Sequence, residues 1–161
     1  MRARQTGFTL IELVVVISIL ALLAAIALPR FAALQTEARM AKMNGALGSI
    51  KAAATLAHAL QLAQNLAPGS AVTMEGPTGN IAMVLGYPTT DLASIGRAAG
   101  LVDDLGNAIP GYLPVKTSAT VFTVSPDSTH SNCSVTYTVP DGVTTFAPAY
   151  SNANITTANC Q

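Results

Sequence analysis

The chain has 161 residues and a mass of 16.4 kDa, so one domain with at most one appended segment is expected. Half of the residues are apolar and only 10% are charged, whereas a soluble domain usually carries about a quarter charged residues. Eight basic residues balance eight acidic ones, which argues against a nucleic-acid-binding protein, and two cysteines cannot complete a four-cysteine zinc site. The excess of apolar residues is concentrated near the N-terminus.

The first predicted element is an apolar run over 8–27 that contains a single charge, Glu12. A helix of this length spans about 30 Å, the hydrocarbon thickness of a bilayer. Arg2 and Arg4 precede the run, so the positive-inside rule places the N-terminus in the cytoplasm and residues 30–161 outside the cytoplasm. The alternative is a cleaved secretory signal peptide, but the apolar core of such a peptide usually has only about 7–15 residues.

Glu12 is the unusual residue of this run, because a carboxylate inside a membrane helix costs about 2.5–3.5 kcal/mol. It follows Phe8 by one helical turn. If the chain is cut before Phe8, the new ammonium group lies close to such a carboxylate, on its own helix or on a neighbouring one. The alternative is a glutamate near the interface that reaches the headgroups or stays protonated.

The stretch Gly7-Phe8-Thr9-Leu10-Ile11-Glu12-Leu13, after a short basic leader and before a long apolar run, resembles the processing motif of type IV prepilins and their pseudopilin relatives. The resemblance implies that a prepilin peptidase cuts between Gly7 and Phe8 and that Phe8 becomes N-methylated. It also implies that Glu12 neutralises the amine of Phe8 in an adjacent subunit during filament assembly. Pro29 would then mark a kink or a melted stretch of the helix.

A helical pattern continues over 30–66 and ends at Ala67-Pro68-Gly69, a strong stop signal. Apolar residues recur along one face at three- and four-residue spacing. A second stripe, which includes Gly45, is made mostly of small residues that allow close approach of another helix. Gly45 and Gly48 are expected to be packing sites and not hinges. A continuous helix over 8–66 would be about 88 Å long.

The segment 68–116 is rich in glycine and proline and is predicted to be a loop-rich connector. Two short elements are expected within it. The first is a strand over 80–85, and the second is a helix over 91–99 that stops at Gly100.

The C-terminal part is expected to form an antiparallel sheet whose inner face covers the stem helix. Its strands are predicted over 120–124, over 134–139 and, after turn chemistry at Pro140-Asp141-Gly142, over 143–146. Cys133 and Cys160 belong to a segment expected outside the cytoplasm, where a structural disulfide is favoured over two free thiols.

Charge divides along the chain, because residues 30–66 carry a net charge of +3 and residues 67–161 a net charge of −4. The simpler explanation is a solvated helix face beside an acidic head. The alternative is that the basic stem of one subunit attracts the acidic head of another.

Other candidate sites are weaker. Asp103, Asp104 and Asn107 could bind calcium, but three ligands are too few for a dedicated site, so turn or cap duty is favoured. His58 and His130 have no partner at ligand spacing, so no metal site and no cofactor are predicted. No motif suggests catalysis, and the chain is not expected to be an enzyme.

Three segments of the head, 72–76, 83–88 and 133–137, are similar to the mannose-sensitive haemagglutinin (MSHA) group of type IV pilins. The resemblance implies an α+β, type IV pilin-like fold, in which the long N-terminal helix packs on a small antiparallel sheet. The expected parts are a leader peptide (1–7), a transmembrane and assembly helix (8–28), a stem helix (29–66) and a globular head (67–161).

The function that the resemblance implies is that of a structural subunit of a type IV pilus used for surface attachment. The precursor would be anchored in the bacterial inner membrane, and the assembled pilus would be extracellular. The implied partners are further copies of the chain, prepilin peptidase and the pilus assembly platform, and no nucleic acid is indicated. The alternatives are a pseudopilin of a type II secretion system and a signal-anchored periplasmic binding module that never polymerises.

Overall fold

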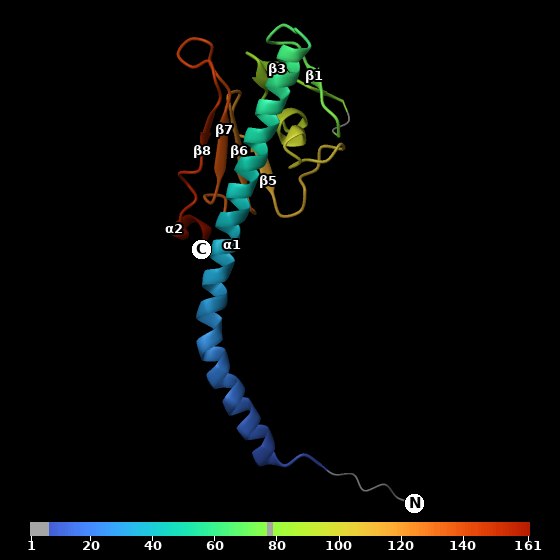
Figure 1. Cartoon of the computed structure of the whole chain (residues 1–161). Coiled ribbons are helices and arrows are strands. Elements are labelled where there is room, and N and C mark those ends of the chain that lie inside the picture. The colour runs from blue at the N-terminus through green and yellow to red at the C-terminus, as the bar shows by residue number, and fades with distance from the viewer. Residues whose placement is uncertain (1–6, 77–78) are drawn as a thin grey trace, which may run out of the picture. The chain divides into compact units, whose positions relative to one another are not determined.

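The computed structural model describes residues 7–76 and 79–161, which form two compact units that meet between Gln35 and Thr36 (Figure 1). Helix α1 (Leu10–Ala63) runs through both units. All other elements belong to the second unit, in the order β1 (Val72–Thr73), β2 (Asn80–Ile81), β3 (Met83–Val84), β4 (Tyr87–Pro88), the π-helical turn η1 (Leu92–Gly96), β5 (Leu113–Lys116), β6 (Val121–Ser125), β7 (Val135–Thr138), β8 (Ala149–Ser151) and α2 (Thr157–Cys160). The α+β architecture expected from the sequence is therefore present.

The end of α1 lies at Ala63, so the end predicted at Leu66 is too late. Asn65 adopts a left-handed backbone conformation with φ of 52°. The amide of Leu66 then donates to the carbonyl of Gln61 at 3.0 Å, and the amide of Asn65 to that of Leu62 at 3.0 Å. This pair of bonds closes the last turn before the Ala67-Pro68-Gly69 stop is reached.

The main sheet has four antiparallel strands in the order β5-β6-β7-β8 (Figure 1). Alternate residues of the two central strands face the head part of α1, and Phe122 lies opposite Tyr137 while Val124 lies opposite Val135. All four side chains have 0% exposure. They share one core cluster with residues of α1 that include Met43, Leu47 and Ile50. The prediction that the inner face of the sheet covers the helix is confirmed.

The strands predicted over 120–124 and 134–139 correspond to β6 and β7 within one residue at each end. The strand predicted over 143–146 is wrong, because that segment is a loop and the edge strand is β8. The carboxylate of Asp141 accepts hydrogen bonds from the amides of Val143, Thr144 and Thr145 at 3.0, 2.9 and 2.7 Å. These bonds hold the segment in a turn instead of a ladder.

The strand predicted over 80–85 divides into β2 and β3, which pair with β1 and β4 respectively. Leu85 and Gly86, with φ of 48° and 89°, form the two-residue turn of the β3–β4 hairpin. A turn with both residues at positive φ suits the twist of antiparallel strands. Strand β5 was not predicted, because Pro114 interrupts its pattern, and a proline is tolerated in a strand at the edge of a sheet.

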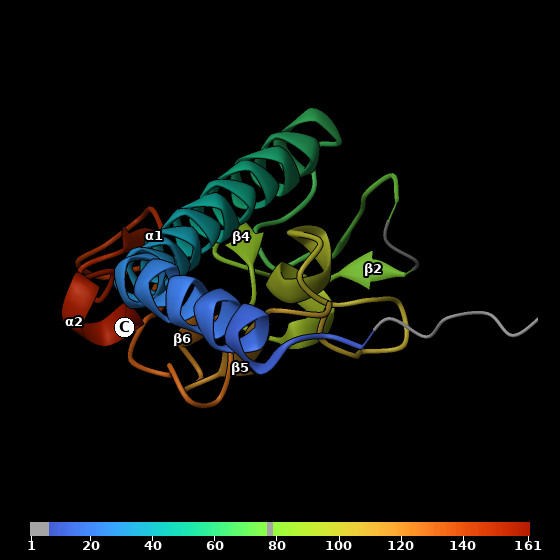
Figure 2. The ribbon, with the colours of Figure 1, turned by 90° about the horizontal axis from the view of Figure 1, so that it is seen from below.

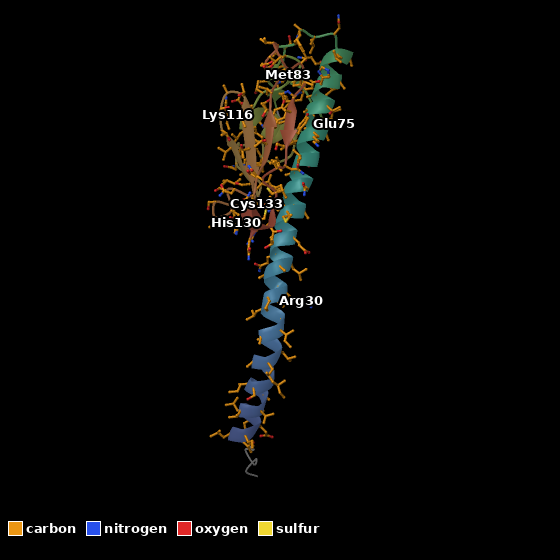
Figure 3. The ribbon with its side chains drawn as sticks, turned by 90° about the vertical axis from the view of Figure 1, so that its left-hand side faces the viewer. Arg30, Glu75, Met83, Lys116, His130 and Cys133 are labelled. Carbon is orange, nitrogen blue, oxygen red and sulfur yellow. A yellow bond between two sulfur atoms is a disulfide. The ribbon has the colours of Figure 1, made fainter. Side chains whose placement is uncertain are left out.

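The helix predicted over 91–99 is a wider π-helical turn over Leu92–Gly96, in which the amide of Arg97 reaches the carbonyl of Leu92. The carboxylate of Asp91 does not cap this turn. It accepts instead from the ammonium of Lys116 at 2.6 Å and from the hydroxyl of Thr89 at 2.9 Å, and both bonds lower the pKa of Asp91 (Figure 3 labels Lys116). The predicted stop at Gly100, with φ of 67°, is confirmed.

Tyr137 joins the main sheet to the hairpin. Its hydroxyl donates to the carbonyl of Pro88 at 2.7 Å, and burial raises the pKa of the phenol. Tyr137→Phe leaves that buried carbonyl without its partner, so we expect the free energy of unfolding to fall by about 1–2 kcal/mol. Tyr112→Phe is the control, since the ring under Lys42 is retained and a change within about 0.5 kcal/mol is expected. Denaturant unfolding of the full chain in micelles measures the free energy of unfolding of both variants. Equal losses for the two variants would contradict the stabilising role of the Tyr137 hydroxyl.

Candidate functional site

The N-terminal motif begins outside the helix. Gly7, Phe8 and Thr9 are not helical, and α1 begins at Leu10. Phe8 is 85% exposed. A methyl group added at Gly7 would meet none of the described residues within 4 Å, so the fold of the described chain does not itself require glycine there.

Thr9 and Glu12 bond to each other across the first turn of α1. The carboxylate oxygen Oε2 of Glu12 accepts from the amide of Thr9 at 2.9 Å and from its hydroxyl at 2.6 Å. The amide of Glu12 donates to the hydroxyl oxygen of Thr9 at 3.3 Å. This is a reciprocal capping box. Glu12 is thus bonded to Thr9 while the nitrogen of Phe8 belongs to the peptide bond with Gly7.

The first part of α1 has an apolar surface that the described chain leaves uncovered. Every Leu, Ile, Val and Phe side chain in 8–28 is exposed by between 45% and 85%. Among the described residues, α1 is the one helix long and apolar enough to cross a membrane. Such a surface needs lipid or other protein around it, since about 25 cal/mol is lost for each Å² of apolar surface left in water.

Helix α1 passes through Pro29 without interruption, so the melted stretch that the resemblance implied does not occur here. Pro29 has no amide hydrogen to donate to the carbonyl of Ala25, and this is the position where the helix lacks one of its bonds. The role of Pro29 in assembly stays a prediction.

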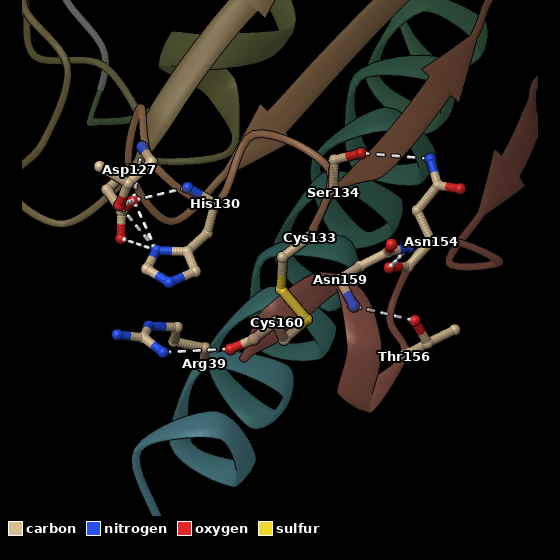
Figure 4. Close-up of a disulfide and its surroundings, with 10 residues drawn as sticks. Arg39, Asp127, His130, Cys133, Ser134, Asn154, Thr156, Asn159 and Cys160 are labelled. Carbon is tan, nitrogen blue, oxygen red and sulfur yellow. Dashed lines mark hydrogen bonds and ion pairs between the residues drawn. A yellow bond between two sulfur atoms is a disulfide. The ribbon is translucent and has the colours of Figure 1, made fainter. Parts of the chain in front are cut away.

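Cys133 and Cys160 form the predicted disulfide, and both cysteines are buried (Figure 4). Thr156 caps α2 by accepting from the amide of Asn159 at 3.2 Å. The guanidinium of Arg39 donates to the carbonyl of Cys160 at 3.1 Å. The C-terminal helix is therefore fastened both to the segment before β7 and to α1. Figure 2 shows α2 and β2 at opposite sides of the head.

The loop before Cys133 is ordered by the carboxylate of Asp127, which accepts from the hydroxyl of Thr129 at 2.6 Å and from the amide of His130 at 2.9 Å (Figure 4). The imidazole Nδ1 of His130 lies 2.8 Å from the same carboxylate. The bond from Thr129, followed by that from His130, holds the pKa of Asp127 well below its usual range. Figure 3 shows His130 and Cys133 together at the end of the head opposite Met83.

Acid should destabilise these loops. Hydrogen bonds lower the pKa of Asp127 and of Asp141 in the folded state, so their contribution to stability is complete above the unfolded value of about 4 and is lost as the pH falls below it. We expect the denaturant midpoint of the full chain to decrease between pH 4 and pH 2. Asp141→Asn should show a smaller decrease over the same interval, and an identical pH profile for the variant would contradict this role of Asp141.

The basic residues of α1 contact aromatic rings of the same chain. The ammonium of Lys42 lies 4.7 Å from the ring centre of Tyr112, and that of Lys51 lies 5.5 Å from the ring centre of Tyr150. These contacts attach the helix to its own head. Attraction between the basic stem and the acidic head of another subunit stays a prediction, as does helix packing at Gly45 and Gly48, where an added methyl group would meet no described residue within 4 Å.

Two of the residues considered for calcium, Asp103 and Asn107, bond to each other. Asp103 accepts from the amides of Leu105 and Asn107 at 3.0 and 2.7 Å and from the side chain of Asn107 at 3.1 Å, and Asp104 pairs with Arg97. The bonds from Asn107 lower the pKa of Asp103. These bonds indicate that Asp103 and Asn107 stabilise a turn of the backbone. In the part of the chain that the structure describes, no three His, Cys, Asp or Glu side chains are grouped to hold a metal ion.

Two residues of these sites were not predicted. Thr9 could have been found, because threonine followed by glutamate three residues later at the start of an apolar run is the sequence signature of a capping box. Arg39 had no such signal, since its partner is a backbone carbonyl 121 residues away along the chain.

Comparison with the sequences of known proteins identifies the same N-terminal motif. Residues 2–28 match the family described as the prokaryotic N-terminal methylation motif. Over 105 residues, 60% of this chain and 69% of its relative, the chain is 35% identical to the fimbrial protein EcpC of Eikenella corrodens. Over 54 residues, 34% of this chain and 47% of its relative, it is 44% identical to the type IV narrow pilus major component PilA5 of Thermus thermophilus. No solved structure matches the chain.

Proposed function

Because this chain belongs to the type IV pilin family, we propose that it is a structural subunit of a type IV pilus that polymerises through its N-terminal helix. The observation that supports this proposal most directly is the exposed apolar surface of α1 over 8–28. Lipid covers such a surface before assembly, and the helices of other subunits replace the lipid afterwards. The main partner is therefore a further copy of the chain.

Residues 1–7 are proposed to be a leader peptide that prepilin peptidase removes by cutting the Gly7–Phe8 bond, after which the amine of Phe8 is methylated. The leader itself lies mostly outside the described residues. The non-helical backbone at Gly7 and Phe8 and the exposure of Phe8 support cleavage at this bond. The basic leader supports an orientation with the N-terminus in the cytoplasm and the head on the other side of the inner membrane.

Glu12 is proposed to pair with the ammonium of Phe8 from an adjacent subunit. In an apolar filament core an unpaired charge is strongly penalised, so the pairing favours insertion of each subunit in one register. Prepilin peptidase and the assembly platform of the inner membrane are the further partners that this route requires. Surface attachment by the assembled filament is the function that we assign to the exposed heads.

The MSHA group is the finer proposal, and the similarity of 72–76, 83–88 and 133–137 to that group supports it. A pseudopilin of a type II secretion system is not favoured, since the relatives are a fimbrial protein and a pilus component.

Gly7→Val tests the proposal. A side chain at this position meets open space in the described chain, so the variant should fold and enter the membrane like the wild type. We expect the rate of cleavage to fall at least a hundredfold, because in the proposed mechanism the peptidase, and not the fold, requires glycine at this position. Immunoblots of whole cells should show the uncut precursor, and electron microscopy should show no filaments. Filaments built from the variant at wild-type abundance would contradict the proposed processing.

A further inference from the structure

We propose that Thr9 is a positioning residue for cleavage of the precursor, because with Glu12 it fixes the start of α1 beyond the Gly7–Phe8 bond. The inference rests on the proposed function, since it concerns the same cleavage. It assigns to Glu12 a first task that precedes its pairing with an amine.

The capping box determines where the helix begins. The first helical bond runs from the amide of Leu13 to the carbonyl of Thr9 at 3.3 Å, which makes Thr9 the N-cap. The amides of Thr9 and Glu12 then have side-chain partners in the box. Amides at a helix start have no partner within the helix, and near hydrocarbon an unbonded amide is costly. The box therefore supplies two of the bonds that a further upstream turn of helix would otherwise supply.

Without the box, the free amides gain most by bonding to carbonyls one turn upstream. Such bonds would draw Phe8 and Gly7 into the helix. A peptide bond drawn into the first turn of a helix has its carbonyl occupied by an amide one turn further on, whereas an extended segment offers both its amide and its carbonyl to a binding partner. A helix that starts at Leu10 keeps the Gly7–Phe8 bond in the form that a peptidase can bind.

The atoms of Glu12 allow the later change of partner. Both bonds from Thr9 end on Oε2, and none of the described residues donates to Oε1. Hydrolysis breaks the bond between the carbonyl carbon of Gly7 and the nitrogen of Phe8. Water supplies the oxygen that makes the Gly7 carboxylate, and the Phe8 nitrogen becomes an ammonium group. Oε1 is then available to an ammonium group while Oε2 still holds the helix start.

Initial-rate kinetics on the full 161-residue chain in detergent micelles, with purified prepilin peptidase, test the inference. Thr9→Val removes the hydroxyl at nearly constant shape, and we expect kcat/KM to fall about fivefold, the usual effect of losing one N-cap. Thr9→Ser keeps the hydroxyl and should stay within about twofold of the wild type. Glu12→Ala should match Thr9→Val. The double variant should be no slower than the slower single variant, because both substitutions remove one device.

Ser18→Ala is the matched control, because the hydroxyl of Ser18 also bonds to the backbone of α1, at 2.7 Å to the carbonyl of Val14, but far from the helix start. Its cleavage rate should equal that of the wild type. NMR of backbone amides should show the helix of Thr9→Val beginning upstream of Leu10. A wild-type rate for Thr9→Val overturns the inference, as do additive losses with an unmoved helix start, since the peptidase then reads each side chain separately. A wild-type precursor that is not cut at all would refute the proposed function itself.

Discussion

Glu12→Ala is expected to reduce the yield of sheared filaments at least tenfold, while cells still convert the precursor completely over hours of growth. In the proposed mechanism the substitution leaves the Phe8 ammonium without a partner in an apolar filament core, and breaking a buried charge pair costs about 3–5 kcal/mol. Because that cost recurs at every subunit, assembly should fail even though each monomer is folded. Quantitative immunoblots of the sheared and membrane fractions measure the two populations.

Glu37→Ala is the control for this experiment. Glu37 is also an exposed acidic residue of α1, but it lies in the second unit. The proposed mechanism does not pair it with the amine of Phe8. Its filament yield should remain near that of the wild type. Filaments of Glu12→Ala at wild-type yield would contradict the assembly role of Glu12.

Replacing both cysteines with serine should lower the free energy of unfolding by about 3 kcal/mol, because the disulfide closes a loop between residues 27 positions apart. The segment that it fastens has little structure of its own, with three residues in β8 and four in α2. Loss of the disulfide should also weaken the bond from Arg39 to the carbonyl of Cys160.

Denaturant unfolding of the full chain in micelles, followed by near-ultraviolet circular dichroism of tyrosine, measures this effect. Ser134→Ala is a suitable control, because Ser134 lies beside Cys133 and is joined to Asn154 by a hydrogen bond and not by a covalent cross-link (Figure 4). Its effect should stay near 1 kcal/mol. A double cysteine variant with an unchanged midpoint would show that the core and Arg39 alone hold the C-terminal segment.

The parts of the fold that could be predicted are those whose signals are local. The apolar run over 8–27 indicates a helix, and the alternating residues of β6 and β7 indicate strands, from consecutive residues alone. The disulfide could be predicted because the chain has two cysteines, both in a segment expected outside the cytoplasm. In the same way, the glycine, aromatic and glutamate of the N-terminal motif are read directly from neighbouring positions.

The parts that could not be predicted depend on competition between local partners or on distant ones. Val143 to Phe146 has a strand-like composition, but three amides of this loop are taken by Asp141, so β8 becomes the edge strand. The bond between Tyr137 and Pro88 joins residues 49 positions apart, and no pattern within either segment indicates it. At the candidate site, Thr9 was not predicted although its signal is local, since a threonine three residues before a glutamate is the sequence signature of a capping box.

The most direct test of the central proposal is the intact mass and N-terminal sequence of the chain in sheared surface material and in membranes. We expect the surface fraction to contain a chain that begins at methylated Phe8, with its disulfide formed. Processed chain confined to the cell envelope would contradict the surface pilus. A chain that retains residues 1–7 in both fractions would contradict the processing on which assembly depends.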